Sequence, residues 1–138
     1  VMANGQRSSS ADGLGVELNG DTTMSNYGYG QMYGYGSSAA FTGTYNAHDM
    51  PYGDIPASTG STFWMVDIAN YSNASVGTML QFYIGSSQNN TALHGMAGMA
   101  YSVASAITNI EINSGTNTSS GYYFVAPTVF TLFGIGSV

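Results

Sequence analysis

The chain has 138 residues, and 43% of them are apolar but only 6% are charged, whereas about a quarter of an average soluble domain is charged. Its single basic residue and its formal net charge of −6 disfavour binding to nucleic acid phosphates and to anionic membranes. The absence of cysteine excludes disulfides and thiolate chemistry. The length suits one hydrophobic core, so we predict a single domain over residues 1–138 with neither nucleic acid nor a membrane as a partner.

Glycine or proline interrupts nearly every apolar run, which favours short strands joined by turns over helices. The first clear strand is predicted at residues 14–18, and it ends at an Asn-Gly-Asp turn over residues 19–21. Residues 26–36 follow as a segment in which tyrosine and glycine recur. Its tyrosines at positions 27, 29, 33 and 35 share one parity, so they should project from one face of an extended chain.

This Tyr/Gly segment has two interpretations. The structural one is a strand whose glycines allow a neighbouring strand to approach closely. The functional one is an aromatic surface for a protein interface or for stacking against sugar rings, because interfaces concentrate aromatic side chains. The candidate contact residues are Tyr27, Tyr29, Tyr33, Tyr35, Tyr45 and Tyr52.

Residues 37–61 contain two prolines and are predicted to be a long connection with at most one short strand. The second half of the chain alternates apolar and polar residues more regularly. Its predicted strands cover residues 63–69, 78–84, 107–112 and 129–135, with a polar loop at 113–121. Residues 93–103 form a strand or a helical turn, of which we favour the strand, and residues 122–125 form a short strand or an arm. Seven or eight short strands without a long helix predict an all-β fold, a jelly-roll-like antiparallel β-sandwich.

Catalytic and metal chemistry find little support in the sequence. His48 lies beside Asp49 in a predicted loop, but no Gly-x-Ser-x-Gly elbow accompanies it, and His94 is distant in sequence. The turn at residues 19–21 offers oxygen ligands, but its spacing matches no known calcium loop. A glycosidase pair could in principle be formed by two of the carboxylates. Structural roles, such as turn residues and outward strand positions, are sufficient to explain their presence. The carboxylates concerned are Asp12, Asp21, Asp49, Asp54, Asp67 and Glu111. We therefore predict no enzyme activity, no catalytic residue, no cofactor and no metal.

A set of motifs in order along the chain resembles small virion proteins of tailed bacteriophages, whose last strand commonly reads "sTftLYGI". The motifs occupy residues 18–21, 26–27, 32–38, 66–71, 106–112 and 130–135. Phe133 stands where the family usually has tyrosine, which keeps the ring but removes a hydroxyl. Relatives usually have further residues and strands before the segment that matches residues 1–4. The resemblance therefore implies that an N-terminal strand is missing or comes from a partner.

The resemblance implies a jelly-roll β-sandwich on the virion surface, made in the cytoplasm of the host bacterium. The first hypothesis is a capsid decoration (cement) protein that binds the major capsid protein or other virion proteins as a homotrimer. The second is a tail-fibre or spike domain that binds host surface glycans. The third is a subunit of an extracellular β-rich filament.

Overall fold

The computed structural model describes residues 2–5, 14–45, 49–50, 61–88, 91–114 and 128–134. Regular structure in this part of the chain is β-structure, with one short 3-10 turn, η1, at Met24–Asn26. None of the helical structure described is long and apolar enough to cross a membrane. The strands are β1 (Met2–Gly5), β2 (Leu14–Leu18), β3 (Tyr27–Tyr35), β4 (Ser38–Tyr45), β5 (Asp49–Met50), β6 (Ser61–Ala69), β7 (Thr78–Gln88), β8 (Thr91–Tyr101), β9 (Ile110–Ser114) and β10 (Val129–Thr131).

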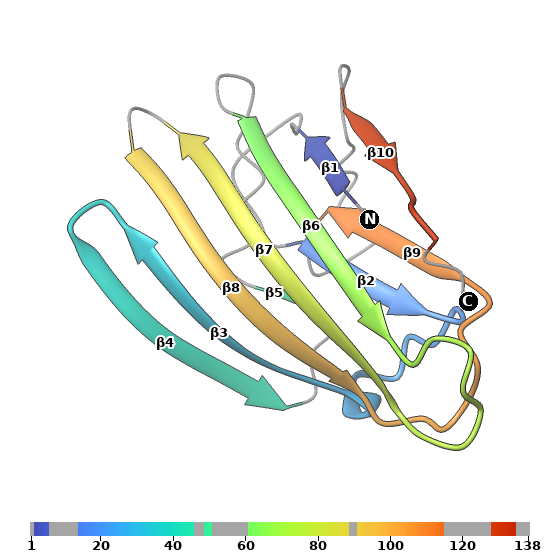
Figure 1. Cartoon of the computed structure of the whole chain (residues 1–138). Helices are drawn as coiled ribbons and strands as arrows, with labels where there is room; N and C mark the ends of the chain where they lie inside the picture. Colours follow the sequence, from blue (N-terminus) through green and yellow to red (C-terminus); the bar gives the residue numbers. More distant parts are fainter. Residues whose placement is uncertain are drawn as a thin grey trace.

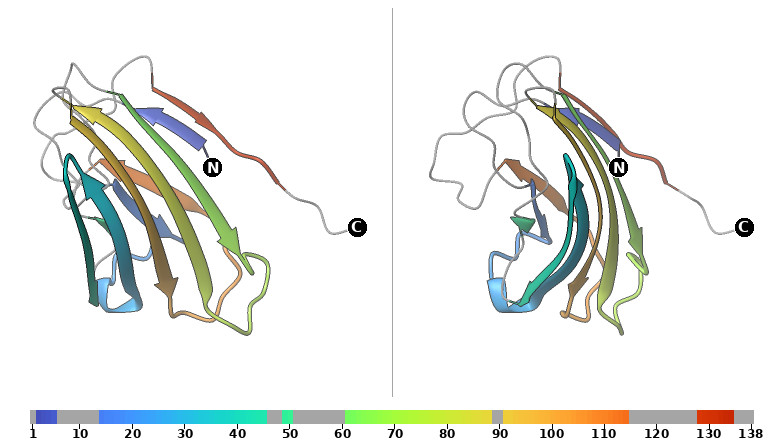
Figure 2. Two further views of the ribbon diagram at one scale, coloured as in Figure 1. Left: turned by 60° about the vertical axis from the view of Figure 1, so that its left-hand side comes forward. Right: turned by 90° about the vertical axis from the view of Figure 1, so that its left-hand side faces the viewer.

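The strands form two antiparallel sheets. A seven-stranded sheet has the order β10-β1-β6-β7-β8-β3-β4, and a three-stranded sheet has the order β5-β2-β9. The small sheet lies against one face of the large sheet (Figure 1), and the large sheet bends around it (Figure 2). The predicted all-β antiparallel sandwich is confirmed.

The core lies between the two sheets. Alternating residues of β6, β7 and β8 point toward the small sheet, and Trp64, Phe82 and Met99 among them are almost fully buried. The small sheet contributes Val16 and Leu18 to the same cluster. Because side chains alternate between the faces of a strand, the intervening residues of β6, β7 and β8 point outward. We call the face of the large sheet that lies against the small sheet the inner face, and the opposite face the outer face.

The main correction concerns residues 37–61. The sequence predicts a connection there, but residues 38–45 form β4, which pairs with β3 along its whole length. This strand is rich in small and polar residues because it lies at the edge of the large sheet, and its described residues from 38 to 41 are all exposed. A strand with two exposed faces carries no apolar alternation for a sequence pattern to detect.

The other strand predictions differ mainly in their bounds. The strand expected at residues 93–103 is β8, and the strand expected at 107–112 begins at Ile110. The final strand is shorter than expected and ends at Thr131. The strand predicted at 122–125 lies outside the described residues.

Candidate functional site

The six candidate tyrosines do not form one exposed surface. Tyr27 and Tyr29 are only 2% and 9% exposed, and they belong to the core. Their side chains share one face as expected, but that face is the inner one, against the small sheet. The prediction that these two tyrosines contact a partner is therefore wrong. Tyr33 is half-buried. For Tyr35 and Tyr45 the described part is the backbone, at the ends of β3 and β4, and Tyr52 lies outside the described residues.

Tyr27 has a structural role at the end of the sandwich. Its hydroxyl accepts a hydrogen bond from the Leu18 amide at 3.0 Å and donates one to the Asp21 carbonyl at 2.8 Å. Its ring packs against that of Tyr101, with the centroids 4.9 Å apart. Burial, which disfavours the charged phenolate, raises the pKa of Tyr27 to about 12. The side chain thus links β2 to the large sheet.

Asp21 stabilises the turn after β2 through hydrogen bonds to its carboxylate. Its carboxylate accepts hydrogen bonds from the Asn26 amide at 2.7 Å, the Thr23 backbone N–H at 2.9 Å and the Tyr101 hydroxyl at 3.1 Å. These donors, the Asn26 amide first, lower the pKa of Asp21 to about 2. Both carboxylate oxygens of Asp21 therefore hold the turn and β8 together.

Asn19 explains the start of the same turn. It adopts a φ of 57°, a left-handed conformation that asparagine tolerates. Its side-chain oxygen accepts a hydrogen bond from the Thr108 amide at 2.7 Å, and its amide group donates to the Ala106 carbonyl at 3.0 Å. The turn after β2 is thereby attached to the segment that leads into β9.

The other polar candidates are scattered. Asp67 is exposed on the outer face, and Glu111 is exposed opposite the buried Glu17 on the small sheet. Among the described residues, no three His, Asp or Glu side chains are grouped so that they could hold a metal ion. Only the backbone of Asp49 is described, as part of β5, and Asp12, His48 and Asp54 lie outside the described residues.

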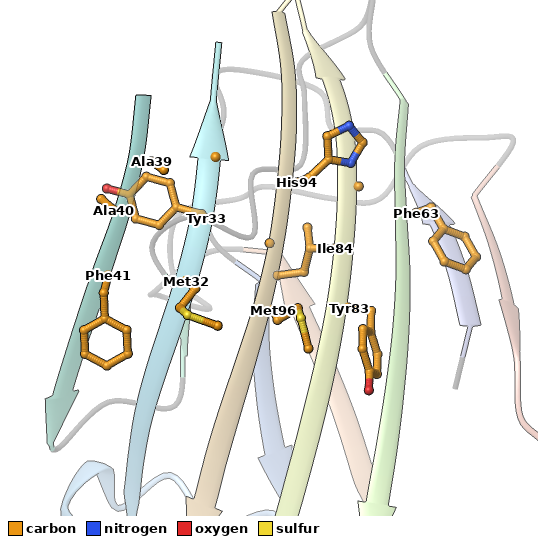
Figure 3. Close-up of a pocket in the computed structure, with 13 residues that line it drawn as sticks. Met32, Tyr33, Ala39, Ala40, Phe41, Phe63, Tyr83, Ile84, His94 and Met96 are labelled. Carbon is orange, nitrogen blue, oxygen red and sulfur yellow. The ribbon is translucent and has the colours of Figure 1, made fainter. Parts of the chain in front are cut away.

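The distinctive surface is the outer face of the large sheet. Strands β3, β4, β7 and β8 contain no Asp, Glu, Lys or Arg at any position. Large apolar side chains nevertheless stand exposed there, including Phe41 at 73% and Met79 at 52%. In the register of the sheet Phe41 lies opposite Met32, Met32 opposite Met96, and Met96 opposite Tyr83. These four residues, which we call the apolar row, follow one another across four neighbouring strands (Figure 3).

A row of smaller residues runs beside the apolar row. Ala39 lies opposite Gly34, Gly34 opposite His94, and His94 opposite Gly85. The step between the large and the small residues leaves a shallow, open groove of about 920 Å³, and Phe63 lies at its β6 end (Figure 3). His94 brings the one imidazole into a lining that is otherwise mainly apolar.

This arrangement is an exposed surface on which large apolar side chains adjoin one another. Contiguous exposed apolar patches larger than a few hundred Å² mark interaction sites on soluble proteins. Methionine side chains are flexible and polarisable, so they adapt to the shape of a partner. Sequence reasoning missed Met32, Phe41, Met79 and Met96, because the same alternation places apolar residues on both faces and does not say which face is covered.

Comparison of the chain with protein family models, with curated proteins and with solved structures finds no match.

Proposed function

We propose that the chain is a non-enzymatic structural protein of a tailed bacteriophage particle, a capsid decoration protein that stabilises the shell. One observation carries the proposal: the outer face exposes large apolar side chains on four strands that contain no charged residue. The proposal also rests on the resemblance of the sequence motifs to small virion proteins. The chain would lie on the virion surface, with the major capsid protein as its partner.

The physical mechanism is thermodynamic. A protein that binds the assembled shell, and not the free subunits, stabilises the shell by mass action. Contact through the uncharged strands β3, β4, β7 and β8 costs little desolvation of ions. Because such a contact does not depend on ion pairs, its affinity should change little between low and high salt.

Glycan binding is less well supported than protein binding. A sugar site needs accessible aromatic faces, and the burial of Tyr27 and Tyr29 removes two of the six candidate aromatics from the surface. We therefore do not propose glycan binding, and the experiment below would detect it as an alternative outcome.

The test uses particles of the phage that encodes the chain. We expect mass spectrometry to find the chain in purified virions and an antibody to label their shells in electron micrographs. Shells from a phage that lacks the gene should rupture at a lower temperature, and adding the purified chain should restore them. Absence from the particle, or labelling of the tail together with binding on a glycan array, would overturn the proposal.

Two matched variants locate the contact. Met79→Glu places a charge on the outer face, whereas Val76→Glu places one in the turn before β7, at a residue of similar exposure, 43% against 52%. We expect Met79→Glu to weaken shell binding about tenfold, as loss of an apolar anchor does, and Val76→Glu to leave it unchanged. Equal effects of the two substitutions would show that the outer face is not the contact surface.

A further inference from the structure

The C-terminal end of the described chain is an apolar segment with little cover. Strand β10 lies at the edge of the large sheet, pairs with β1, and exposes all three of its residues. The next two residues, Leu132 and Phe133, are 72% and 64% exposed. A side chain added at Gly134 would meet no atom within 4 Å. We call residues 132–134 the arm, and Figure 2 shows it leaving the body of the sandwich.

The groove on the outer face has a mainly apolar lining, which suits an apolar segment such as the arm. It crosses the strands from β4 to β6, which is four strand spacings, or roughly 19 Å at about 4.8 Å each. The three residues of the arm, extended at about 3.3 Å each, reach roughly 10 Å and so cover about half of that distance. Leucine and phenylalanine side chains can pack against Met32 and Met96, since thioether sulfur makes favourable contacts with aromatic rings.

Charge argues that the occupant is a second copy of this chain. Two copies each carry a formal charge of −6 and repel one another wherever their acidic groups approach. The arm has no charged side chain, and neither have residues 128–138 as a whole. The strands β3, β4, β7 and β8 under the groove have none either. Contact between arm and groove is therefore one that copies of an acidic chain can make without bringing like charges together.

We infer that the arm of one copy binds in the outer-face groove of a second copy. Arm and groove are different surfaces, so the contact is heterologous and leaves each copy with one free arm or one free groove. Such a contact either closes into a ring, of which a trimer is a small example, or continues into a filament. The inference rests on the proposed function only in taking the outer face as a surface for protein contacts.

Two variants of the full chain disable one surface each. The double substitution Leu132→Asp and Phe133→Asp charges the arm and leaves the groove intact. Met96→Glu charges the apolar row and leaves the arm intact. Val76→Glu is the matched control, because Val76 is an apolar residue of nearly the same exposure as Met96, 43% against 44%, but lies in the turn before β7 and does not line the groove. Circular dichroism and thermal unfolding verify that each variant is folded.

Light scattering coupled to size-exclusion chromatography and sedimentation velocity measure association. We expect the unmodified chain and Val76→Glu to form the same oligomers. We expect the arm variant and Met96→Glu to be monomeric, with association weakened at least about tenfold. When these two variants are mixed, the intact arm of one can enter the intact groove of the other, so a one-to-one complex should form.

Three outcomes would overturn the inference: a monomeric unmodified chain at millimolar concentration, a mixture of the two variants that stays monomeric, or a Val76→Glu variant as impaired as Met96→Glu. These outcomes differ from those that test the virion proposal. A chain that associates through its arm but is absent from particles refutes only the proposed function. A chain that decorates shells but is monomeric in solution refutes only the arm contact.

Discussion

The two faces of the seven-stranded sheet are both apolar, yet only one is covered by the small sheet. On the inner face Phe82 and Leu80 are almost completely buried under β2 and β9. On the outer face Met79, which directly precedes Leu80 in the sequence, is more than half exposed. The same strands supply both sets of side chains at alternating positions. Burial is thus decided by where the small sheet lies and not by the kind of side chain.

The contrast separates stability from association. Inner-face side chains contribute to the free energy of unfolding because they are removed from water on folding. Outer-face side chains remain in water in the isolated chain, so substituting them should leave that free energy nearly unchanged.

The largest effect is expected from a matched pair of phenylalanines. Phe82→Ala removes a ring that is fully buried and should lower the free energy of unfolding by about 3–4 kcal/mol. Phe41→Ala removes a ring that is 73% exposed and should change it by less than about 0.5 kcal/mol. Denaturant titration followed by tryptophan fluorescence measures both. Equal losses of stability would mean that the outer face is as structural as the inner one.

The second largest effect on stability is expected at one of a pair of glycines. A Cβ atom at Gly77 would lie 2.6 Å from the Tyr101 carbonyl oxygen, whereas at outward-facing Gly98 the nearest atom is 3.9 Å away. We expect Gly77→Ala to cost about 2 kcal/mol through overpacking and Gly98→Ala less than about 0.5 kcal/mol. Thermal unfolding compares the two. A Gly77→Ala variant as stable as the unmodified chain would show that the backbones do not approach so closely.

Tyr27→Phe tests a buried hydroxyl at the end of the inner face. It removes the acceptor of the Leu18 N–H and should cost about 1–2 kcal/mol, while Tyr83→Phe on the outer face should cost less than about 0.5 kcal/mol. The pKa of Tyr27 is raised to about 12 in the folded chain, against about 10 when unfolded.

The stabilisation linked to this shift is present below pH 10 and is lost as the pH rises through 12. The unmodified chain should therefore lose stability more steeply than Tyr27→Phe between those values. Parallel pH profiles for the two proteins would contradict the assignment.

The smallest effect is expected at Asp21, whose carboxylate is partly exposed. Asp21→Asn should cost about 1 kcal/mol at pH 7, a value discounted because solvent screens the group. The folded pKa, about 2, lies below the ordinary value of 3.8, so the stabilisation is present above about pH 4 and is lost as the pH falls toward 2.

Unfolding curves of the two proteins should therefore converge at low pH, and a constant difference down to pH 2 would count against the hydrogen-bonded carboxylate. The exposed Asp67→Asn serves as the control, with no expected change at pH 7.

The sequence was sufficient for the sandwich and for most of its strands. The alternation in residues 63–69 and 78–84 predicts β6 and β7 directly, and the turn at Asn19 follows from its tolerance of a left-handed backbone. Strand β4 was missed, because an edge strand such as residues 38–45 needs no apolar face.

The candidate surface was harder to predict than the fold. Tyr27 and Tyr29 were candidates because aromatic residues mark interfaces, but their parity with Gln31 places them under the small sheet. Recognising Met32 and Met96 as exposed requires knowing that β2 and β9 cover the other face. That knowledge depends on a pairing between distant parts of the chain, which local periodicity does not contain.

The pairing of β2 with β9 and of β1 with β10 also affects the order in which the strands can pair during translation. Strand β2 pairs along its whole length with β9, so this pairing must wait until residue 114 has been translated, whereas β1 can pair with β6 before β10 is made. The hairpins of β6, β7 and β8 can close earlier, because their partners are neighbours along the nascent chain. Until the small sheet forms, both apolar faces of those hairpins are exposed to water. The nascent chain can therefore aggregate through either face, whereas the folded chain exposes only the outer one.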